Sequence, residues 1–82
     1  MNENTAIEFH DWDGKIHHLS IIQIRKHIPK RLIPHVEEIN IDSDGGWVWL
    51  KDSAIDTLNE SHTIHFYTLK ELDNELKEVK II

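Results

Sequence analysis

The chain has 82 residues, no cysteine and seven histidines, and its formal net charge at pH 7 is −6. A chain of this length forms one domain and buries only about 60–65% of its unfolded surface, so its margin of stability is small. The absence of cysteine excludes disulfide bonds and thiol nucleophiles and is typical of a reducing cytoplasm. No apolar run approaches the ~20 residues of a membrane span, and no basic leader precedes one. We therefore expect a cytoplasmic single domain over residues 1–82, flexible at residues 1–5.

The charges are unevenly distributed along the chain. Residues 25–35 contain four basic side chains and no acidic one, whereas residues 36–60 contain seven acids against one lysine. An acidic protein is repelled by nucleic acid at long range and attracted to basic surfaces. The basic segment, residues 25–31, is the exception and could contact phosphates. Its candidate nucleic-acid-binding residues are Arg25, Lys26, Lys30 and Arg31.

The first element that we expect is a β-hairpin around the Asp-Gly pair at 13–14. Asp-Gly favours a two-residue loop, which would place His10 opposite His17 and Phe9 on the same face as Ile16. The alternative is a three-residue loop with a bulge, which would pair Asp11 with Lys15 and Ile7 with Leu19. We prefer the two-residue loop because its sequence signal is stronger.

A short helix follows this hairpin. Ser20 and Gln23 have the spacing of a capping box, in which each side chain bonds the other residue's backbone N–H. Pro29 disfavours helical geometry in the residue before it and so ends the helix. The apolar stripe of this helix consists of Ile21, Ile24 and Ile28.

The hairpin over 39–50 carries apolar residues on both faces. A two-residue Asp-Gly loop predicts that Ile41 lies opposite Val48 and that Asp42 lies opposite Trp47. One face is then an ordinary aliphatic core face. The other face holds the two tryptophans beside an acid and an amide, so it is either covered by a helix or open to a partner. The tryptophan face consists of Asn40, Asp42, Trp47 and Trp49.

The C-terminal part predicts a strand followed by a helix. Residues 63–67 alternate Ile64 and Phe66 with polar or partly polar residues, as in a half-buried strand. Thr68 and Glu71 form a second capping box, and a leucine stripe predicts a helix from Leu69 to about Val79. A one-turn helix after Ser53 is also expected. The order β-β-α-β-β-β-α indicates an α+β domain with a largely antiparallel sheet and one or two helices packed on it.

Two histidines are weak candidates for a metal site. In the preferred register His10 and His17 are cross-strand neighbours about 5 Å apart, with Glu8 as a third possible ligand. No zinc-binding spacing supports such a site, and polar residues commonly fill the solvent face of a hairpin. We therefore predict no metal and no cofactor.

The sequence does not favour catalysis. No Gly-x-Ser-x-Gly occurs, and three glycines in the whole chain leave no phosphate-binding loop. A chain of this size also rarely encloses a pocket of catalytic volume. We predict that the protein is not an enzyme.

The leading hypothesis is a non-enzymatic, acidic protein-binding module that occupies a basic surface of a nucleic-acid-handling protein. In size and charge, although in no motif, the chain is similar to small phage or mobile-element proteins that block host or defence factors, and to some antitoxins and immunity proteins. Nucleic-acid binding through residues 25–31 and homo-oligomerisation are the alternatives. The predicted protein-binding residues are Trp12, Glu37, Glu38, Asp42, Asp44, Trp47 and Trp49.

Overall fold

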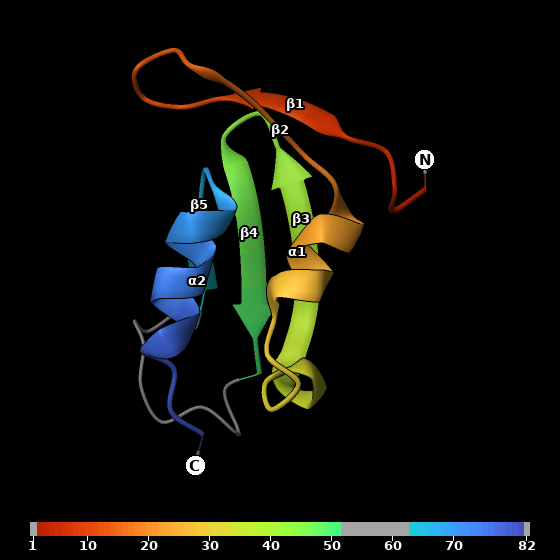
Figure 1. Cartoon of the computed structure of the whole chain (residues 1–82), viewed down its shortest axis with the longest axis vertical. Helices are drawn as coiled ribbons and strands as arrows, with labels where there is room; N and C mark the ends of the chain where they lie inside the picture. Colours follow the sequence, from red (N-terminus) through yellow and green to blue (C-terminus); the bar gives the residue numbers. More distant parts are fainter. Residues whose placement is uncertain (1, 52–62, 82) are drawn as a thin grey trace.

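The computed structural model describes residues 2–51 and 63–81. It confirms the α+β class and the predicted order of elements, with one additional 3₁₀ turn, η1. The strands form two antiparallel sheets, β1-β2 and β3-β4-β5 (Figure 1). The predicted turn after Ser53 lies outside the described residues. The bounds are β1 Ile7–His10, β2 Ile16–Leu19, α1 Ile21–His27, η1 Ile33–His35, β3 Val36–Asp42, β4 Gly45–Leu50, β5 Thr63–Phe66 and α2 Leu69–Lys77.

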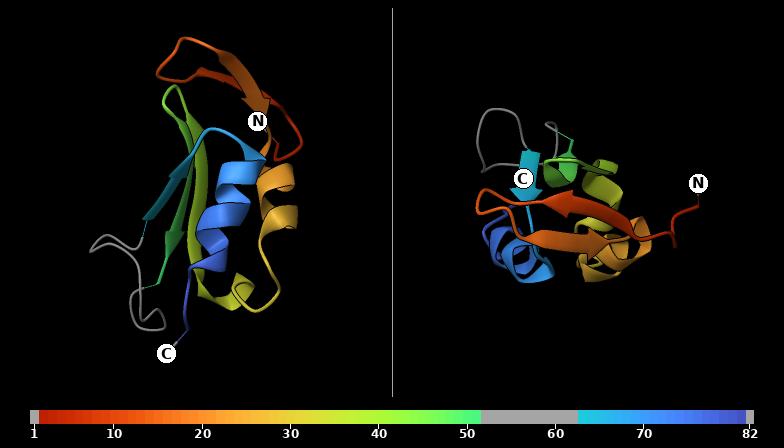
Figure 2. Two further views of the ribbon diagram at one scale, coloured as in Figure 1. Left: turned by 60° about the vertical axis from the view of Figure 1, so that its left-hand side comes forward. Right: turned by 90° about the horizontal axis from the view of Figure 1, so that it is seen from above.

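Both helices lie on one face of the three-stranded sheet (Figure 2). The helix α1 packs beside β3 and α2 packs beside β5, and the two helices also contact each other. Their buried side chains join those of the sheet in one hydrophobic core. Neither helix is long and apolar enough to cross a membrane, nor is any other helix within the described residues. The buried core consists of Phe9, Leu19, Ile24, Ile28, Leu32, Ile41, Val48, Leu50, Ile64, Phe66, Leu72, Leu76 and Val79.

The β1-β2 hairpin lies across the end of the sheet where β3 turns into β4 (Figures 1 and 2). Its Phe9 is only 1% exposed and stacks on the rings of His17 and Tyr67, at centroid distances of 5.4 and 6.3 Å. The hairpin therefore closes one end of the core. At its base, the Ile22 N–H donates to the Glu3 carbonyl oxygen at 3.0 Å. The predicted flexibility of residues 1–5 stays a prediction.

The preferred register of this first hairpin is wrong, and the three-residue loop is correct. The observed pairs include Ile7 with Leu19 and Phe9 with His17. The Asp11 carboxylate accepts hydrogen bonds from the backbone N–H groups of Asp13 and Lys15 at 2.8 and 2.9 Å, which favours the longer loop. Gly14 takes the positive φ of 79° that such a loop requires.

The predicted register of β3 and β4 is also wrong, by two residues. Ile39, rather than Ile41, pairs with Val48, and the two-residue loop is Ser43-Asp44. The Asp42 carboxylate starts the turn early by accepting the Asp44 N–H at 2.8 Å. Because side chains alternate with a period of two, a two-residue shift leaves every side chain on its predicted face.

Both predicted helix starts are confirmed, and α2 ends slightly early. Ser20 and Gln23 form the complete capping box of α1. At α2 the Thr68 hydroxyl accepts the Glu71 N–H at 3.2 Å, but the Glu71 carboxylate bonds the N–H of Tyr67 instead of that of Thr68. The regular helix ends at Lys77 rather than near Val79.

Gly46 fits the sheet because it has no side chain. A Cβ atom at this position would lie 2.5 Å from two ring atoms of Phe66, the β5 residue with which Gly46 pairs. Phe66 is a fully buried core residue, so its ring has little freedom to move away.

We predict that Gly46→Ala destabilises the protein by about 1–3 kcal/mol, because it overpacks this contact. Urea denaturation of Gly46→Ala, Phe66→Leu and the double variant measures the effect. The smaller leucine should make room, so the double variant should lose less stability than the two single changes added together. Unfolding of Gly46→Ala at the same urea concentration as the wild type would contradict the tight contact between Gly46 and Phe66.

Candidate functional site

The sheet face opposite the helices carries most of the predicted protein-binding residues. In the observed register Glu38 pairs with Trp49 and Asn40 with Trp47, and Trp47 pairs with His65 on the next strand. No helix within residues 2–51 and 63–81 lies over this face (Figure 2). The two tryptophans therefore do not pack against a described helix. We call this sheet face the outer face; it consists of Glu38, Asn40, Asp42, Trp47, Trp49, Thr63 and His65.

A row of stacked rings crosses the outer face. Trp47 stacks on Trp49 at a centroid distance of 5.8 Å and on His65 at 4.1 Å, and His65 meets the edge of Tyr67 at 4.9 Å. Both tryptophans are partly buried and His65 is exposed. The row is therefore a preformed aromatic surface with little rotamer freedom left to lose on binding.

Hydrogen bonds hold this row in place. The Trp47 indole N–H donates to the Asp42 carboxylate at 3.1 Å. The His65 Nε2 atom lies 2.6 Å from the Asp44 carbonyl oxygen, to which it donates. Asp42 thus fixes both the turn and the indole, whereas no hydrogen bond or ion pair that we find among the described residues occupies the carboxylate of Asp44.

The two hairpin turns enclose a hollow of about 140 Å³ at one end of the aromatic row. Trp12, at the tip of the first hairpin, is 90% exposed and lines it together with Asp44. We call it the Trp12 notch. Its lining residues are His10, Asp11, Trp12, Asp44 and Tyr67.

The Trp12 notch has a negative electrostatic potential. Partial burial raises the pKa of Tyr67, and the neighbouring carboxylates of Asp44, Asp11 and Glu71 raise it further. The hydrogen bond from His17 lowers the pKa of Asp11, as do backbone hydrogen bonds, so this acid stays ionised. Carboxylates beside aromatic rings suit a cationic side chain of a partner.

The structure divides the predicted protein-binding residues between two places. The tryptophans and the acids of the β3-β4 turn meet on the outer face and at the Trp12 notch. Glu37 and Glu38 lie near the other end of β3, where a bulge interrupts its pairing with β4, and Glu38 also belongs to the outer face. There both acids line a second hollow together with Ile28, the residue that follows α1.

The two histidines that were weak candidates for a metal pair do not face each other. His10 and His17 lie on opposite faces of the first hairpin because the true register is shifted by one residue. His17 lies 2.8 Å from a carboxylate oxygen of Asp11, while His10 and His18 flank Glu8 at 3.7 and 3.3 Å. Within the described part of the chain, no three histidine or acidic side chains are grouped so as to hold a metal ion.

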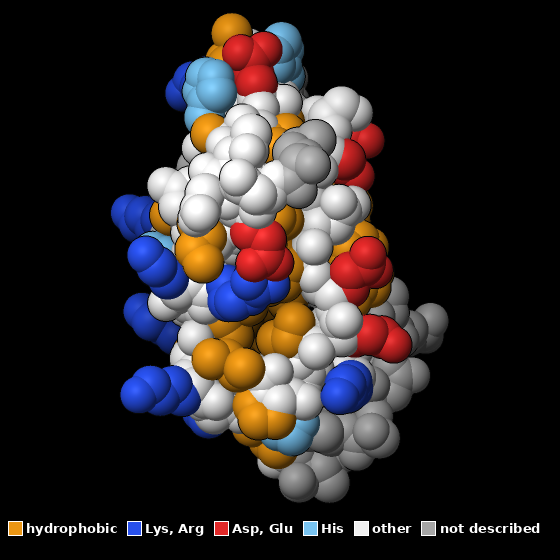
Figure 3. Space-filling model, turned by 90° about the vertical axis from the view of Figure 1, so that its right-hand side faces the viewer, with side chains coloured by type: hydrophobic (Ala, Val, Ile, Leu, Met, Phe, Trp, Pro, Cys, Tyr) orange, Lys and Arg blue, Asp and Glu red, His pale blue; other side chains and the backbone are white. Residues whose placement is uncertain are grey.

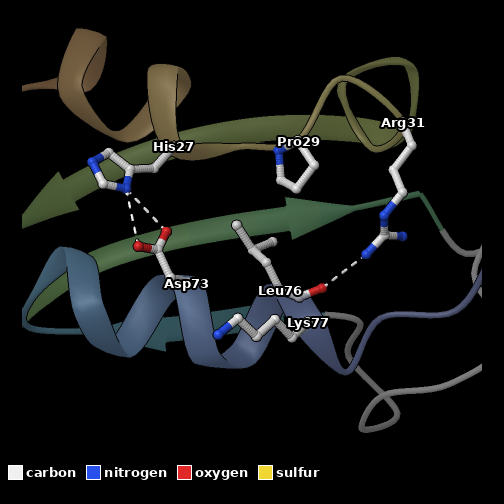
Figure 4. Close-up of a pocket in the computed structure, with 6 residues that line it drawn as sticks. All are labelled: His27, Pro29, Arg31, Asp73, Leu76 and Lys77. Carbon is white, nitrogen blue, oxygen red and sulfur yellow. Dashed lines mark hydrogen bonds and ion pairs between the residues drawn. The ribbon is translucent and has the colours of Figure 1, made fainter.

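The basic segment mainly joins α1 and its following turn to other parts of the fold. The Arg31 guanidinium donates to the carbonyl oxygens of Leu76 and Val79 at 3.2 Å each, and so caps the end of α2 (Figure 4). Arg25 forms a two-bond ion pair with Glu3. Lys26 and Lys30 are exposed.

A hollow of about 250 Å³ separates the two helices beside Arg31 (Figure 4). His27 and Asp73 pair across it at 2.9 Å, and Pro29 and Leu76 supply apolar walls. Because an acid lies within this hollow and Arg31 is already bonded, it offers a phosphate group a weak site.

On the side of the molecule shown in Figure 3, basic and acidic side chains follow different margins. In Figure 3 most Lys and Arg side chains follow the margin of the helix layer, and most Asp and Glu side chains follow the margin of the sheet. Asp42 and Asp44 lie at the β3-β4 turn, whereas Glu37 and Glu38 line the same hollow as Arg25 of the basic segment.

Sequence reasoning missed His65 and Tyr67 as parts of the site. Both lie at alternate positions of the strand expected over residues 63–67, so their shared face was readable. The alternation of residues does not show which strand lies next to residues 63–67. Only the fold shows that β5 pairs with β4 and so brings both residues to the tryptophans.

Comparison with protein-family models, with curated proteins and with solved structures finds no match for this chain. Its function is therefore inferred from the geometry and charge of its own surface.

The negative potential at the notch can be measured directly, because Tyr67 is the single tyrosine of the chain. We predict that its hydroxyl ionises above the ordinary pKa of 10.0, and that Asp44→Asn lowers the midpoint by removing one of the charges that raise it. Alkaline titration followed by tyrosinate absorbance measures both values, with circular dichroism confirming that the fold persists. Asp73→Asn, on α2, is the control and should leave the midpoint unchanged. Equal midpoints for wild type and Asp44→Asn would contradict a negative potential at the notch.

Proposed function

We propose that this chain is a non-enzymatic protein-binding module that docks its outer face and Trp12 notch on a basic surface of another protein. The observation that carries the proposal is the stacked row of Trp47, Trp49 and His65 on a sheet face over which no described helix lies. Tryptophan is enriched among the residues that dominate binding energy at interfaces.

The acids around this row supply direction and selectivity. Glu38, Asp42 and Asp44 are all exposed and border the aromatic row on the β3 side and at the turn. Complementary charge raises association rates and disfavours wrong partners more than it adds affinity. The aromatic row then supplies the apolar contact that holds the complex.

A nucleic-acid-handling protein is the partner class that fits best. Its binding groove is already positive, so an acidic domain could occupy it in competition with nucleic acid. An inhibitor of the phage or mobile-element kind acts in this way with no chemistry of its own. We assign the chain this role, in keeping with its size, its net charge of −6 and its aromatic surface.

Nucleic-acid binding by the chain itself is the weaker alternative. Arg25 and Arg31 are engaged with Glu3 and with the end of α2, so their contacts to phosphate would compete with contacts that join the fold together. The exposed pair Lys26 and Lys30 is too small a basic patch to overcome the overall negative charge.

The test uses immobilised protein, cell lysate and mass spectrometry, and compares three versions of the chain. We expect the wild type to retain nucleic-acid-binding proteins and single-stranded DNA to release them, because both compete for one groove. Trp12→Ala with Asp44→Lys should lose that retention, since it removes an exposed aromatic anchor and reverses one exposed charge.

The matched control is Ile16→Ala with Glu75→Lys. It removes a side chain that is 57% exposed on the same hairpin and, like Asp44→Lys, reverses one acidic charge, here on the exposed side of α2. This variant should retain the same proteins as the wild type. Equal retention by all three versions, or retained proteins that single-stranded DNA does not release, would overturn the proposal.

A further inference from the structure

The free edge of β3 lies beside an apolar groove. Among the described strands β3 pairs with β4 alone, so its other edge has no strand partner. A hollow of about 270 Å³ runs along this edge between α1, η1 and β3. Figure 3 faces it and shows hydrophobic side chains gathered around the hollow. Its lining residues are Arg25, Ile28, Ile33, Val36, Glu37, Glu38 and Ile39.

The backbone of β3 is oriented to accept another strand at this edge. Asp42 and Gly45, which flank the two-residue loop, form a hydrogen-bonded pair. Along an antiparallel ladder hydrogen-bonded and non-hydrogen-bonded pairs alternate, so the pairs made by Ile41 and Ile39 are not hydrogen-bonded. The N–H and C=O groups of Ile39 and Ile41 therefore point away from β4. An extended segment laid along the edge could bond to both residues.

The groove offers apolar contacts together with negative charge. Ile33 is 49% exposed at its margin, and the side chains of Ile28 and Val36 form part of its wall. Glu37 and Glu38 are both exposed, while the charge of Arg25 is offset by its ion pair with Glu3. The groove is therefore selective for a strand that carries basic and apolar residues.

We propose that this groove binds an extended segment of the partner, with alternating Lys or Arg and apolar residues, which adds to β3 as a further strand. The inference rests on the proposed function, because it names the part of the basic partner that the acidic module would hold. Main-chain hydrogen bonds would supply affinity, and the acids with the apolar groove would supply the selection.

A second copy of the chain fits this edge poorly. The strand β3 contains three acids and no basic residue, as its sequence VEEINID shows. In an antiparallel pairing of two copies centred on Asn40, Glu38 of one copy would face Asp42 of the other, and like charges in direct opposition destabilise a sheet. The same acids protect the edge from self-association and select a basic strand.

The experiment uses the full chain labelled with ¹⁵N and a set of short peptides. The probe is a peptide of alternating lysine and valine, and its counterpart replaces every lysine with glutamate. Two further lysine peptides carry N-methyl groups on every second amide, one in each register. Fluorescence anisotropy measures affinity, and hydrogen exchange measures protection of the amides of Ile39 and Ile41.

We expect the lysine peptide to bind and to protect both amides, and the glutamate peptide not to bind. Only one of the two N-methylated peptides should bind, because alternate amides of an added strand face the protein. Glu38→Lys should weaken binding about tenfold, as expected for the loss of a close charge pair. Glu75→Lys, an equal charge change on the exposed side of α2, is the control and should have little effect.

Several results would overturn the inference. Equal binding of both N-methylated peptides would mean that charge alone, without main-chain hydrogen bonds, holds the peptide. A dimer joined at β3 would mean that a second copy of the chain occupies the edge. If no peptide bound, the acids would serve only to protect the edge from self-association. Retention of partner proteins in the lysate experiment would separate these failures from failure of the proposed function, because Trp12 and Asp44 do not line this groove.

Discussion

The two helices of the described residues cover one face of the sheet, and the candidate site follows from which face they cover. The helices take the face on which Val48, Leu50 and Ile64 form an unbroken aliphatic surface, because burial of that surface is the main favourable term of folding. The stacked rings of Trp47, Trp49 and His65 lie on the other face. Two hydrogen bonds within that face, from Trp47 to Asp42 and from His65 to Asp44, order the row on a face over which no described helix lies.

The two hairpins show which errors in a predicted strand register change the faces of the side chains. Both turns contain Asp-Gly, and both registers differ from the simplest two-residue loop centred on that pair. In the second hairpin the difference is two residues, so the predicted separation of aliphatic and tryptophan faces survives. In the first hairpin it is one residue, so the predicted histidine pair is split between faces while Leu19 joins Phe9 in the core. Local turn propensity does not distinguish these registers. They are set by the backbone hydrogen bonds that the Asp11 and Asp42 carboxylates accept and by the burial of Leu19.

Local signals predicted the helices and strands, but long-range packing determined the site. Ser20 with Gln23 and Thr68 with its helix start were readable because caps involve residues a few positions apart. The Trp12 notch joins turns that are about thirty residues apart in sequence, and no periodicity places one over the other. Arg31 shows the same limit. Its charge indicated a phosphate contact, yet the fold uses it to cap a helix whose end is more than forty residues away.

The basic residues of α1 and of the turn after it affect how a basic partner would approach. At a distance such a partner would be attracted by the net charge of −6, and close to the surface the Lys and Arg side chains of residues 25–31 would disfavour contact on the α1 side. Contact on the sheet side would then be favoured over contact on the α1 side. Glu38 belongs both to the outer face, where it pairs with Trp49, and to the groove at the open edge of β3. A partner that placed a structured basic surface on the outer face would have its neighbouring chain within reach of that edge. The second contact would then form at high effective concentration, so two individually weak surfaces could together hold one partner firmly.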